Sequence, residues 1–332
     1  MQKNNGLAIP PTAVKIVIGV VILAVLIAVI TVLYANVPAD GKPGAAIDYP
    51  KEWDKGWDAI KWVDSMVEWA VVNWSPFFEG IRSGVLFILL PFRDFLQWLP
   101  WWLVVAGTGL LTWRVVGKKF GVIALLFLVF MALMGLIDLL MLTLAITLTA
   151  TLLCVLMGIP MGVAAAKSNR FDELLRPVLD GMQTMPSFVY LIPAIMLFGL
   201  GMTPAVVATV IYSIPPIIRF TNLGIRQVDA SVVEASKSFG ATPWQLLTKI
   251  QIPLALPTIL AGMNQTVMMA LAMVVIASLI GAQGLGAEVW TGIQRLEVGR
   301  GIIAGTSIVF TAIILDRVSQ AFGRRWETGA IT

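Results

Sequence analysis

Residues 234–253 read EASKSFGATPWQLLTKIQIP, in which small side chains and a glycine precede a Thr-Pro pair. This stretch is the centre of a polar insert of about 35 residues, Thr221 to Ala255, which separates two long apolar runs. Most of the other polar connections on the same side of the expected helix bundle are short. A long, structured insert at this position therefore indicates a specific function.

The insert has the local signals of two short helices. Residues Val232–Phe239 suit a short amphipathic helix with small residues on one side, and Gly240 can end it by adopting a positive φ. Thr242 can cap a second short helix that has a proline at its first position, and Pro253 with Pro257 then turns the chain into the next apolar run. A projecting helix–glycine–helix segment suits docking into a groove on a partner, although an ordinary amphipathic connector would have the same pattern.

The flanking apolar runs indicate a membrane protein. Hydrophobic residues make up 58% of the chain and charged residues 13%, whereas a soluble protein carries about a quarter charged residues. Because a helix rises about 1.5 Å per residue and the hydrocarbon core is about 30 Å thick, a span needs about 20 apolar residues. We predict an all-α polytopic membrane protein with about eight transmembrane helices, at residues 13–34, 99–116, 119–140, 143–166, 180–201, 203–220, 256–281 and 301–320.

Basic residues predict which way these helices run. Fifteen lie in the short segments on the side of the N-terminus, and two, Arg295 and Arg300, lie in the short segments on the other side. The fifteen are Lys3, Lys15, Arg114, Lys118, Lys119, Lys167, Arg170, Arg176, Arg219, Arg226, Lys237, Lys249, Arg317, Arg324 and Arg325. Both termini and the insert 221–255 are therefore predicted to be cytoplasmic. The net charge of +4 reflects this orientation rather than nucleic-acid binding.

Residues 1–98 form a predicted N-terminal region, and residues 99–332 form the predicted transmembrane core. The first apolar run could be a cleaved signal peptide, because Lys3 and Lys15 precede it. It is longer than a usual signal core, however, and no clear A-x-A site follows. We therefore expect a retained transmembrane helix.

Segment 35–98 is rich in tryptophan. One helical face would contain Trp53, Trp57, Ile60, Val63, Val67, Val71 and Trp74. This favours an external amphipathic helix at the membrane interface, although an aromatic cage for a quaternary ammonium ligand is an alternative explanation of the tryptophans. Because Pro91, Arg93 and Asp94 interrupt the apolar run that follows, we expect 84–98 to be re-entrant or interfacial rather than a ninth span.

The chain lacks the residues that several kinds of enzyme need. It contains no histidine and a single cysteine, Cys154, inside an apolar run. This excludes His-based nucleophilic catalysis, His-ligated metal sites and an intrachain disulfide. The phosphate-binding sequence G-x-x-x-x-G-K-[ST] is also absent from the sequence, so any ATP hydrolysis that drives transport must occur on another polypeptide.

An ion-coupled secondary transporter is the main alternative from another functional class. Such proteins place carboxylates near the bilayer midplane, and Asp138, Asp180 and Asp316 are the candidates here. Asp138 is expected near the outer end of its span, Asp180 can pair with Arg176 four residues earlier, and Asp316 adjoins Arg317 near the cytoplasmic face. We expect structural roles for all three. A scaffold or an integral-membrane enzyme is a further alternative, for which no catalytic constellation is visible.

Prolines and polar side chains inside the spans indicate a translocation path. The prolines at 186, 193, 215 and 216 are expected to interrupt the fifth and sixth spans and to free backbone carbonyls that must face protein or a cavity. Amides in the seventh span can join helices or line a pore, and the methionines after them can pack or form a flexible gate. We predict that the fifth and seventh spans line the path. The candidate residues are Met185, Pro186, Phe188, Tyr190, Asn264, Gln265 and Met268.

The spacing within the insert carries a family resemblance. Glu-Ala-Ser-x3-Gly-x9-Ile-x-Ile-Pro resembles the EAA loop of binding-protein-dependent ABC importer permeases, usually E-A-A-x3-G-x9-I-x-L-P. Ser236 and Ile252 depart from that pattern by small changes of like size. In that family the loop forms a coupling helix that seats in a groove of the ATPase subunit. The resemblance implies an ATPase-coupling site made of Glu234, Ala235, Ser236, Gly240, Ile250 and Pro253.

Four further blocks extend the resemblance over about Leu139 to Arg317. LRPVLDGMQTMP (175–186), FVYLIP (188–193), LGIRQV (223–228) and GAQGLG (281–286) are similar to the glycine betaine/proline betaine/choline permeases of osmoprotectant uptake. The resemblance implies a bacterial inner-membrane permease with the type I ABC importer fold, without a cofactor or an ATPase site of its own. It also implies a permease homodimer that works by alternating access with two copies of an ATPase, which binds ATP and Mg, and with an extracytoplasmic binding protein that selects the solute. Trimethylamine N-oxide and carnitine are alternative substrates.

Overall fold

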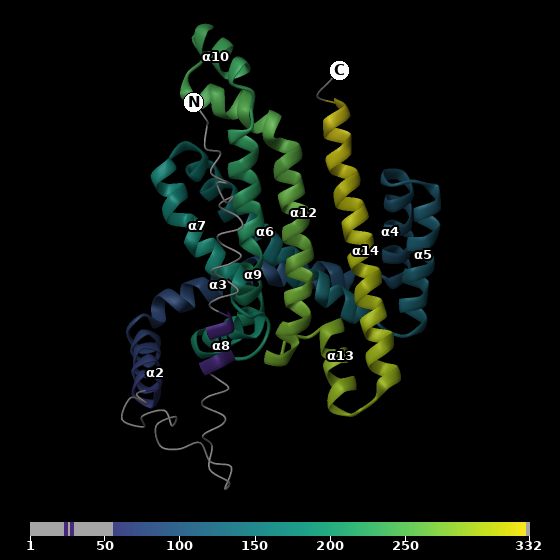
Figure 1. Ribbon diagram of the computed structural model, residues 1–332. Coiled ribbons are helices and arrows are strands. Elements are labelled where there is room, and N and C mark those ends of the chain that lie inside the picture. Colours follow the sequence, from purple (N-terminus) through teal and green to yellow (C-terminus); the bar gives the residue numbers. More distant parts are fainter. Residues whose placement is uncertain (1–22, 26, 30–55, 330–332) are drawn as a thin grey trace, which may run out of the picture. The chain divides into compact units, whose positions relative to one another are not determined.

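The computed structural model describes residues 23–25, 27–29 and 56–329, and every regular element among them is a helix. Contacts divide the chain into two units, Met1–Met66 and Val67–Thr332. The helices are α2 (Gly56–Asn73), α3 (Ser75–Trp98), α4 (Trp101–Val115), α5 (Lys118–Leu133), α6 (Ile137–Lys167), α7 (Asn169–Thr184), η2 (Ser187–Tyr190), α8 (Leu191–Phe198), α9 (Met202–Arg226), α10 (Ala230–Ser238), α11 (Pro243–Leu246), η3 (Leu247–Gln251), α12 (Ile252–Ala277), η4 (Ser278–Ile280), α13 (Leu285–Gln294) and α14 (Val298–Gly329) (Figure 1).

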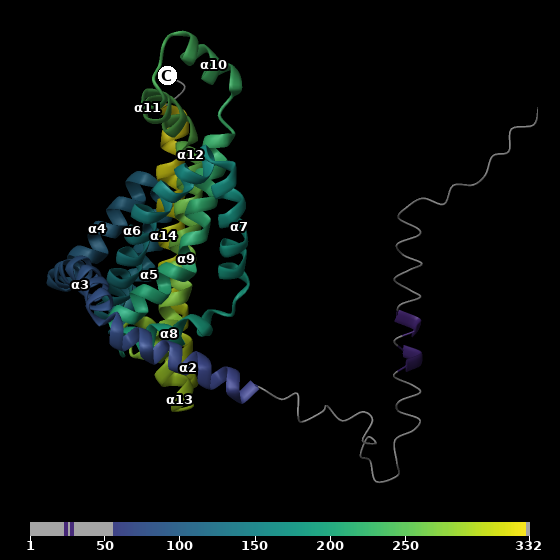
Figure 2. The same cartoon turned by 90° about the vertical axis from the view of Figure 1, so that its left-hand side faces the viewer.

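Three long helices, α6, α9 and α12, form the centre of the second unit. They run side by side in both ribbon views, with α9 packed on α6 and on α12 (Figures 1 and 2). The contact between α6 and α9 depends on two glycines. A Cβ added at Gly158 would overlap the Ile217 side chain, and one at Gly162 would lie 2.5 Å from Thr221 Cβ and 2.7 Å from the Ile218 carbonyl oxygen. A Gly-x3-Gly pair thus lets the two backbones approach closely, as small residues do between membrane helices.

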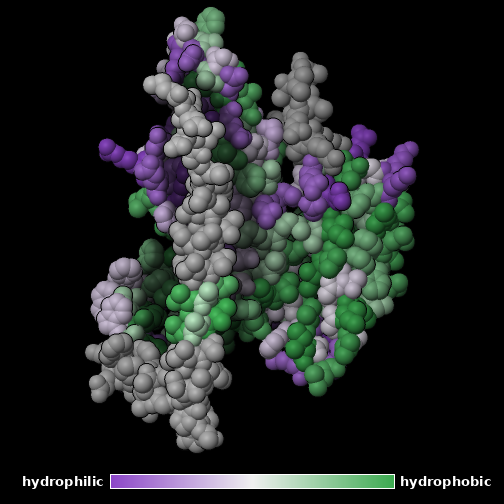
Figure 3. Space-filling model, viewed as in Figure 1, coloured by the Kyte–Doolittle hydropathy of each residue, from purple (hydrophilic) through white to green (hydrophobic). Residues whose placement is uncertain are grey.

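A second apolar cluster joins α4, α5, α14 and the start of α6. Met131 and Leu140 are buried in it, and the ring of Phe127 on α5 stacks on that of Phe310 on α14 with centroids 3.7 Å apart. The face formed by α4, α5 and α14 is mostly hydrophobic below their upper ends, whereas hydrophilic side chains gather over α7 and α10 (Figure 3). α10 lies at one end of the bundle, and α13 lies at the opposite end (Figure 1).

Five of the described helices are long and apolar enough to cross a membrane, or six if one bent pair counts as a span. The sequence predicted about eight. The predicted span 13–34 falls largely outside the described residues and stays a prediction. Spans 99–116 and 119–140 correspond to α4 and α5, whose 15 and 16 residues give lengths of only about 23 and 24 Å, less than the hydrocarbon thickness.

The boundary predicted between the third and fourth spans is also wrong. α5 ends at Leu133 and α6 begins at Ile137, so the expected break at 141–142 lies inside α6. The chain turns where Gly135 adopts a φ of +70°, which a glycine tolerates. Asp138 consequently lies in the first turn of α6, and not at the end of the preceding span. Continuous hydrophobicity on both sides of Gly135 conceals this turn in the sequence.

Helix α3 differs from the expectation for residues 84–98. Pro91, Arg93 and Asp94 do not interrupt it, because it is continuous from Ser75 to Trp98 and is long and apolar enough to count as a span. Arg93 and Asp94 pair with each other at 2.7 Å. In the two ribbon views α3 runs across α6 and α9 rather than along them (Figures 1 and 2). Its length therefore does not by itself make it a transmembrane helix.

The prolines of the fifth and sixth spans behave differently from each other. Predicted span 180–201 is two pieces, because the chain bends by 107° between α7 and the η2–α8 pair, at Met185 and Pro186. Pro193, by contrast, is accommodated within α8. Helix α9 continues through Pro215 and Pro216, both buried, so the predicted interruption of the sixth span is wrong.

The tryptophan-rich segment forms a helix, as the periodicity predicted. α2 covers Gly56–Asn73, whereas Trp53, which the predicted face included, lies outside the described residues. Trp62 and Trp69 expose more than half of their side-chain surface. An amphipathic interfacial helix is consistent with these exposed indoles.

Candidate functional site

The EAA loop, defined as residues 221–255, starts in the last turns of α9 and then forms a capped helix, α10, that ends at a glycine. Asp229 caps α10 by accepting a hydrogen bond from the Ser231 amide at 2.8 Å. At the other end Gly240 adopts a φ of +81°, its amide donates to the Lys237 carbonyl at 2.9 Å, and the next amide donates to the Ser236 carbonyl at 3.1 Å. These two bonds are a Schellman motif with glycine at the position that requires a left-handed conformation. The predicted role of Gly240 in ending the helix is confirmed.

Thr242 caps the second helix of the EAA loop, as predicted. Its hydroxyl accepts from the Gln245 amide at 3.3 Å, and the Gln245 side chain accepts from the Thr242 amide at 2.9 Å. This is a capping box, followed by a proline in the first turn. The helix does not end there, however. α11 continues through the π-helical turn η3 into α12, so the predicted turn at Pro253 and Pro257 is wrong.

The π turn explains why the helix continues past Pro253. A proline lacks the amide that would continue an α-helical ladder. Immediately before it, the Ile252 amide bonds to the Leu247 carbonyl, five residues back, and this wider turn resets the ladder so that Pro253 falls in the first turn of α12. Ile250 is half-buried in the π turn, and Pro253 is exposed.

The EAA loop presents an exposed surface with two aromatic side chains. Phe239 is 92% exposed and Trp244 is 72% exposed, and Glu234 and Ala235 are exposed beside them on α10. Ser236 is half-buried, and its hydroxyl donates to the Val232 carbonyl at 2.6 Å. The serine thus satisfies its own hydroxyl group within the helix, which explains why it can stand where the EAA pattern has alanine.

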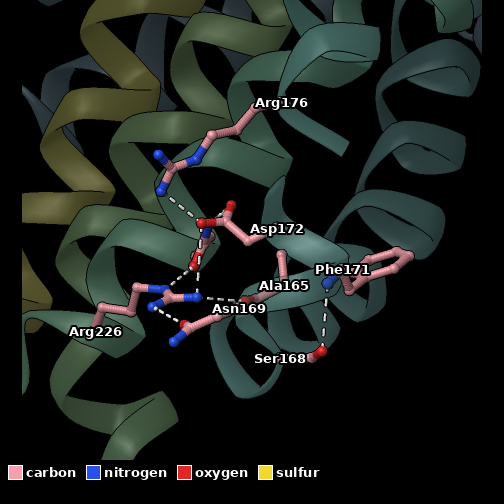
Figure 4. Close-up of polar contacts among 8 residues, drawn as sticks. Ala165, Ser168, Asn169, Phe171, Asp172, Arg176 and Arg226 are labelled. Carbon is pink, nitrogen blue, oxygen red and sulfur yellow. Dashed lines mark hydrogen bonds and ion pairs between the residues drawn. The ribbon is translucent and has the colours of Figure 1, made fainter. Parts of the chain in front are cut away.

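Both ends of the EAA loop are attached to the end of α6. On the entry side, Arg226 Nη2 donates to the Ala165 carbonyl at 2.8 Å (Figure 4). On the exit side, Lys167 Nζ donates to Gln251 Oε1 at 2.6 Å. A cation near the last carbonyls of a helix is favourable because of the helix dipole. The two contacts fix the loop relative to a long central helix.

A buried carboxylate, Asp172 of α7, gathers the neighbouring polar groups, which we name the Asp172 cluster (Figure 4). Its members are Asp172, Asn169, Arg176, Asn222 and Arg226. The Asp172 side chain is 7% exposed, with Arg176 Nη2 at 2.5 Å, Asn222 Nδ2 at 2.7 Å and Arg226 Nη2 at 3.6 Å. Arg226 also donates to Asn222 Oδ1 at 2.7 Å and to Asn169 Oδ1 at 2.8 Å.

The sequence pattern does not reveal this cluster, and the partner predicted for one of its members is wrong. Arg176 was expected to pair with Asp180, four residues later, but it pairs with Asp172, four residues earlier. Asp180 instead accepts from Arg219 of α9 at 2.5 Å. Two carboxylates lie at equal helical spacing from Arg176, so the spacing alone could not decide between them.

Four of the predicted path residues lie together at the break between α7 and η2. Met185 and Pro186 form the break, and Phe188, which follows it, is 60% exposed. Tyr190 is buried, its hydroxyl donates to the Met182 carbonyl at 2.5 Å, and its ring packs edge-on against Tyr212. The break is therefore held to the end of α7 by Tyr190, whereas the Phe188 side chain is exposed.

The other three predicted path residues lie on α12. Asn264 Nδ2 donates to Asp316 Oδ1 on α14 at 3.0 Å, which is the helix-joining role that the sequence left open beside pore lining. Gln265 is exposed and Met268 is half-buried. Asp316, a candidate for ion coupling, also accepts a hydrogen bond from Gln320 Nε2 at 2.7 Å. Its carboxylate thus joins α12 to α14, as expected for a structural role.

Comparison with known proteins decides the family. Residues 158–328, which contain the whole EAA loop, match the family described as binding-protein-dependent transport system inner membrane component. The chain belongs to this family. It is the inner-membrane permease of a binding-protein-dependent ABC transport system, with ATPase and binding-protein partners, and ATP is hydrolysed by the partner ATPase rather than by this chain.

Several permeases are similar over most of the chain. The glycine betaine/proline betaine transport system permease protein ProW of Escherichia coli (strain K12) is 48% identical over 275 residues, which are 80% of this chain and 78% of ProW. The glycine betaine/carnitine transport permease protein GbuB of Listeria monocytogenes is 46% identical over 271 residues, covering 80% and 95%. A solved structure of the MetNI methionine ABC transporter in an inward-facing conformation matches 57% of this permease and 93% of that chain, with 23% identity and a TM-score of 0.49.

Proposed function

We propose that this permease imports glycine betaine, proline betaine or a closely related osmoprotectant. The support comes from relatives that match 80% of this chain at 46–49% identity and whose names specify glycine betaine. The same relatives name proline betaine and carnitine as second substrates. The permease shares its solute with a separate binding protein, which selects the ligand, so the permease needs no tight site of its own.

A trimethylamine N-oxide importer is the second candidate. The trimethylamine N-oxide permease TmoV of Ruegeria pomeroyi is 40% identical over 224 residues, but these residues make up only 34% of that protein. Glycine betaine and trimethylamine N-oxide both carry a bulky methylated ammonium group, for which aromatic side chains are favourable neighbours. Competition between the two solutes therefore tests the choice directly.

We propose a homodimer in which each copy contributes one EAA loop to one of two ATPase subunits. The described part of the chain has one EAA loop, which can contact one ATPase subunit. Two ATPase subunits therefore require two copies of the permease. The excess of basic residues in the short segments on the α10 side supports a cytoplasmic location for that end and for both termini. The binding protein would then dock at the α13 end, and closure of the ATPases would move α10 so that the bundle alternates between inward and outward access.

The decisive experiment is uptake into proteoliposomes that contain this permease, its ATPase and its binding protein. We expect radiolabelled glycine betaine to accumulate only when ATP and both partners are present. Excess unlabelled trimethylamine N-oxide should compete weakly, because the binding protein discriminates between the two solutes. Uptake by the permease alone, driven by a proton or sodium gradient, would contradict the proposal and would favour ion coupling.

Exposed aromatic residues of the EAA loop supply a second prediction. We expect Trp244→Ala to reduce co-purification of the ATPase and to lower uptake about tenfold, because aromatic anchors at the centre of an interface contribute about 2 kcal/mol or more. Trp98→Ala is the matched control, since Trp98 is 76% exposed and lies far along the chain on α3. Equal losses of ATPase binding in the two variants would rule out Trp244 as a contact.

A further inference from the structure

Helix α7 connects the EAA loop region to the break that carries four predicted path residues. Its first turn contributes Asn169 and Asp172 to the Asp172 cluster, and its last residue, Thr184, precedes the 107° bend. The helix has 16 residues, which corresponds to a length of about 24 Å. Tyr190, beyond the bend, is hydrogen-bonded back to Met182 near the end of α7. Both ends of α7 are therefore attached to elements with proposed functions.

The Asp172 cluster also fixes the end of α9 from which α10 emerges. Asn222 and Arg226 lie in the last turns of α9, and Asp229, three residues after Arg226, is the cap of α10. The Arg226 guanidinium contacts Asn169 and Asp172 on α7, Asn222 on α9 and the Ala165 carbonyl on α6 (Figure 4). A planar group with five donors can hold three helices in one relative position in this way.

A purely stabilising role does not account for the cluster well. Replacement of buried ion pairs by apolar residues is often neutral or stabilising, because removal of the charges from water is costly. Buried polar networks are better suited to specifying one relative arrangement of the elements that they join. Here the joined elements are the base of the EAA loop and the start of α7.

We propose that Asp172 is a positioning residue that transmits movement of the EAA loop through α7 to the break at Pro186. When the ATPases move α10, the end of α9 moves with it. Because Asp172 of α7 is bonded to Asn222 and Arg226 of α9, α7 is displaced together with α9. Met182 and Tyr190 then carry the displacement to the path residues beyond the bend. This inference rests on the proposed importer function and adds the connection between its two sites.

The test compares Asp172→Asn with wild type in the proteoliposomes described above. The asparagine keeps the shape and can still accept from Asn222, but it cannot neutralise Arg176 and Arg226. We expect the ATP hydrolysed per molecule of glycine betaine taken up to rise about tenfold, which is a typical coupling between two sites, while the hydrolysis rate stays within about twofold of wild type. A merely structural residue would lower uptake and hydrolysis together.

Glu173→Gln is the matched control. Glu173 is the next residue on α7, has the same charge and is exposed, so its substitution should leave the ratio of ATP to solute unchanged. If Asp172→Asn fails to reach the membrane, Arg226→Lys replaces it, because an ammonium keeps the charge but cannot reach Asn169, Asn222 and Ala165 together.

Two results separate failure of this inference from failure of the proposed function. Wild-type proteoliposomes that do not take up glycine betaine with ATP would overturn the proposed substrate, and the same variants would then be measured with radiolabelled trimethylamine N-oxide, the second candidate. Wild-type uptake together with an unchanged ratio of ATP to solute in both Asp172→Asn and Arg226→Lys would overturn the role of Asp172.

Discussion

A Gly240→Pro permease is expected to insert in the membrane at normal levels and to lose about 99% of its ATP-driven uptake. Gly240 has a φ of +81°, and its amide donates to the Lys237 carbonyl. Proline fixes φ near −65° and has no amide hydrogen, at a cost of about 3 kcal/mol or more. In the proposed coupling role, the loop must adopt this conformation to engage the ATPase, so the same free-energy cost applies to the transport step. A difference of this size corresponds to about a hundredfold in the rate of uptake.

Gly240→Asn separates the conformational requirement from the loss of a small residue. A Cβ at Gly240 would meet nothing within 4 Å, so added size is tolerated, and asparagine adopts the left-handed conformation more readily than other side chains. We expect uptake within about threefold of wild type, consistent with the small cost of such a residue at a helix end. The measurement is uptake per permease in the membrane. Equal activity of the proline variant and wild type would contradict the coupling role of the EAA loop.

A Gly162→Leu permease is expected not to reach a folded state. A Cβ at this position would already lie 2.5 Å from Thr221 Cβ and 2.7 Å from a backbone oxygen of α9, so neither atom can simply rotate away. Gly162→Ala should be folded but less stable by about 2 kcal/mol, as for overpacking in other cores, and its melting temperature should fall by several degrees. The measurement is the fraction that stays monodisperse in detergent as temperature rises.

Gly181→Leu is the control for this prediction. Gly181 is exposed on α7, and a Cβ there would meet nothing within 4 Å. Its melting temperature should change by about 2 °C or less, as for ordinary surface substitutions. If Gly162→Leu and Gly181→Leu were equally stable, the close packing of α6 on α9 would not be essential to the fold.

The features that depend on neighbouring residues in the chain were predictable. Gly240 and Thr242 determine the two helix ends of the EAA loop because capping bonds join groups within a few residues of each other. The apolar runs likewise indicated most of the long helices, since hydrophobicity over about 20 residues is a local property. The length of α5 was overestimated, because the apolar sequence continues through the turn at Gly135 that follows it.

The features that depend on packing were not predictable from one sequence. Prolines at 186, 215 and 216 give the same local signal, yet only Pro186 coincides with a break, whereas α9 is continuous through Pro215 and Pro216, which are both buried among packed helices. Asp172 and Asp180 are equally spaced from Arg176, and the choice between them depends on which side of α7 faces α9.

The sequence by itself determined the membrane class, the family and the EAA loop, because hydropathy, spacing and capping act between residues that are close along the chain. Only the tertiary structure decided that a buried aspartate joins the base of that loop to α7, and that α7 ends at the break with the predicted path residues. These contacts join residues about 50 positions apart, and their geometry follows from how α6, α7 and α9 pack.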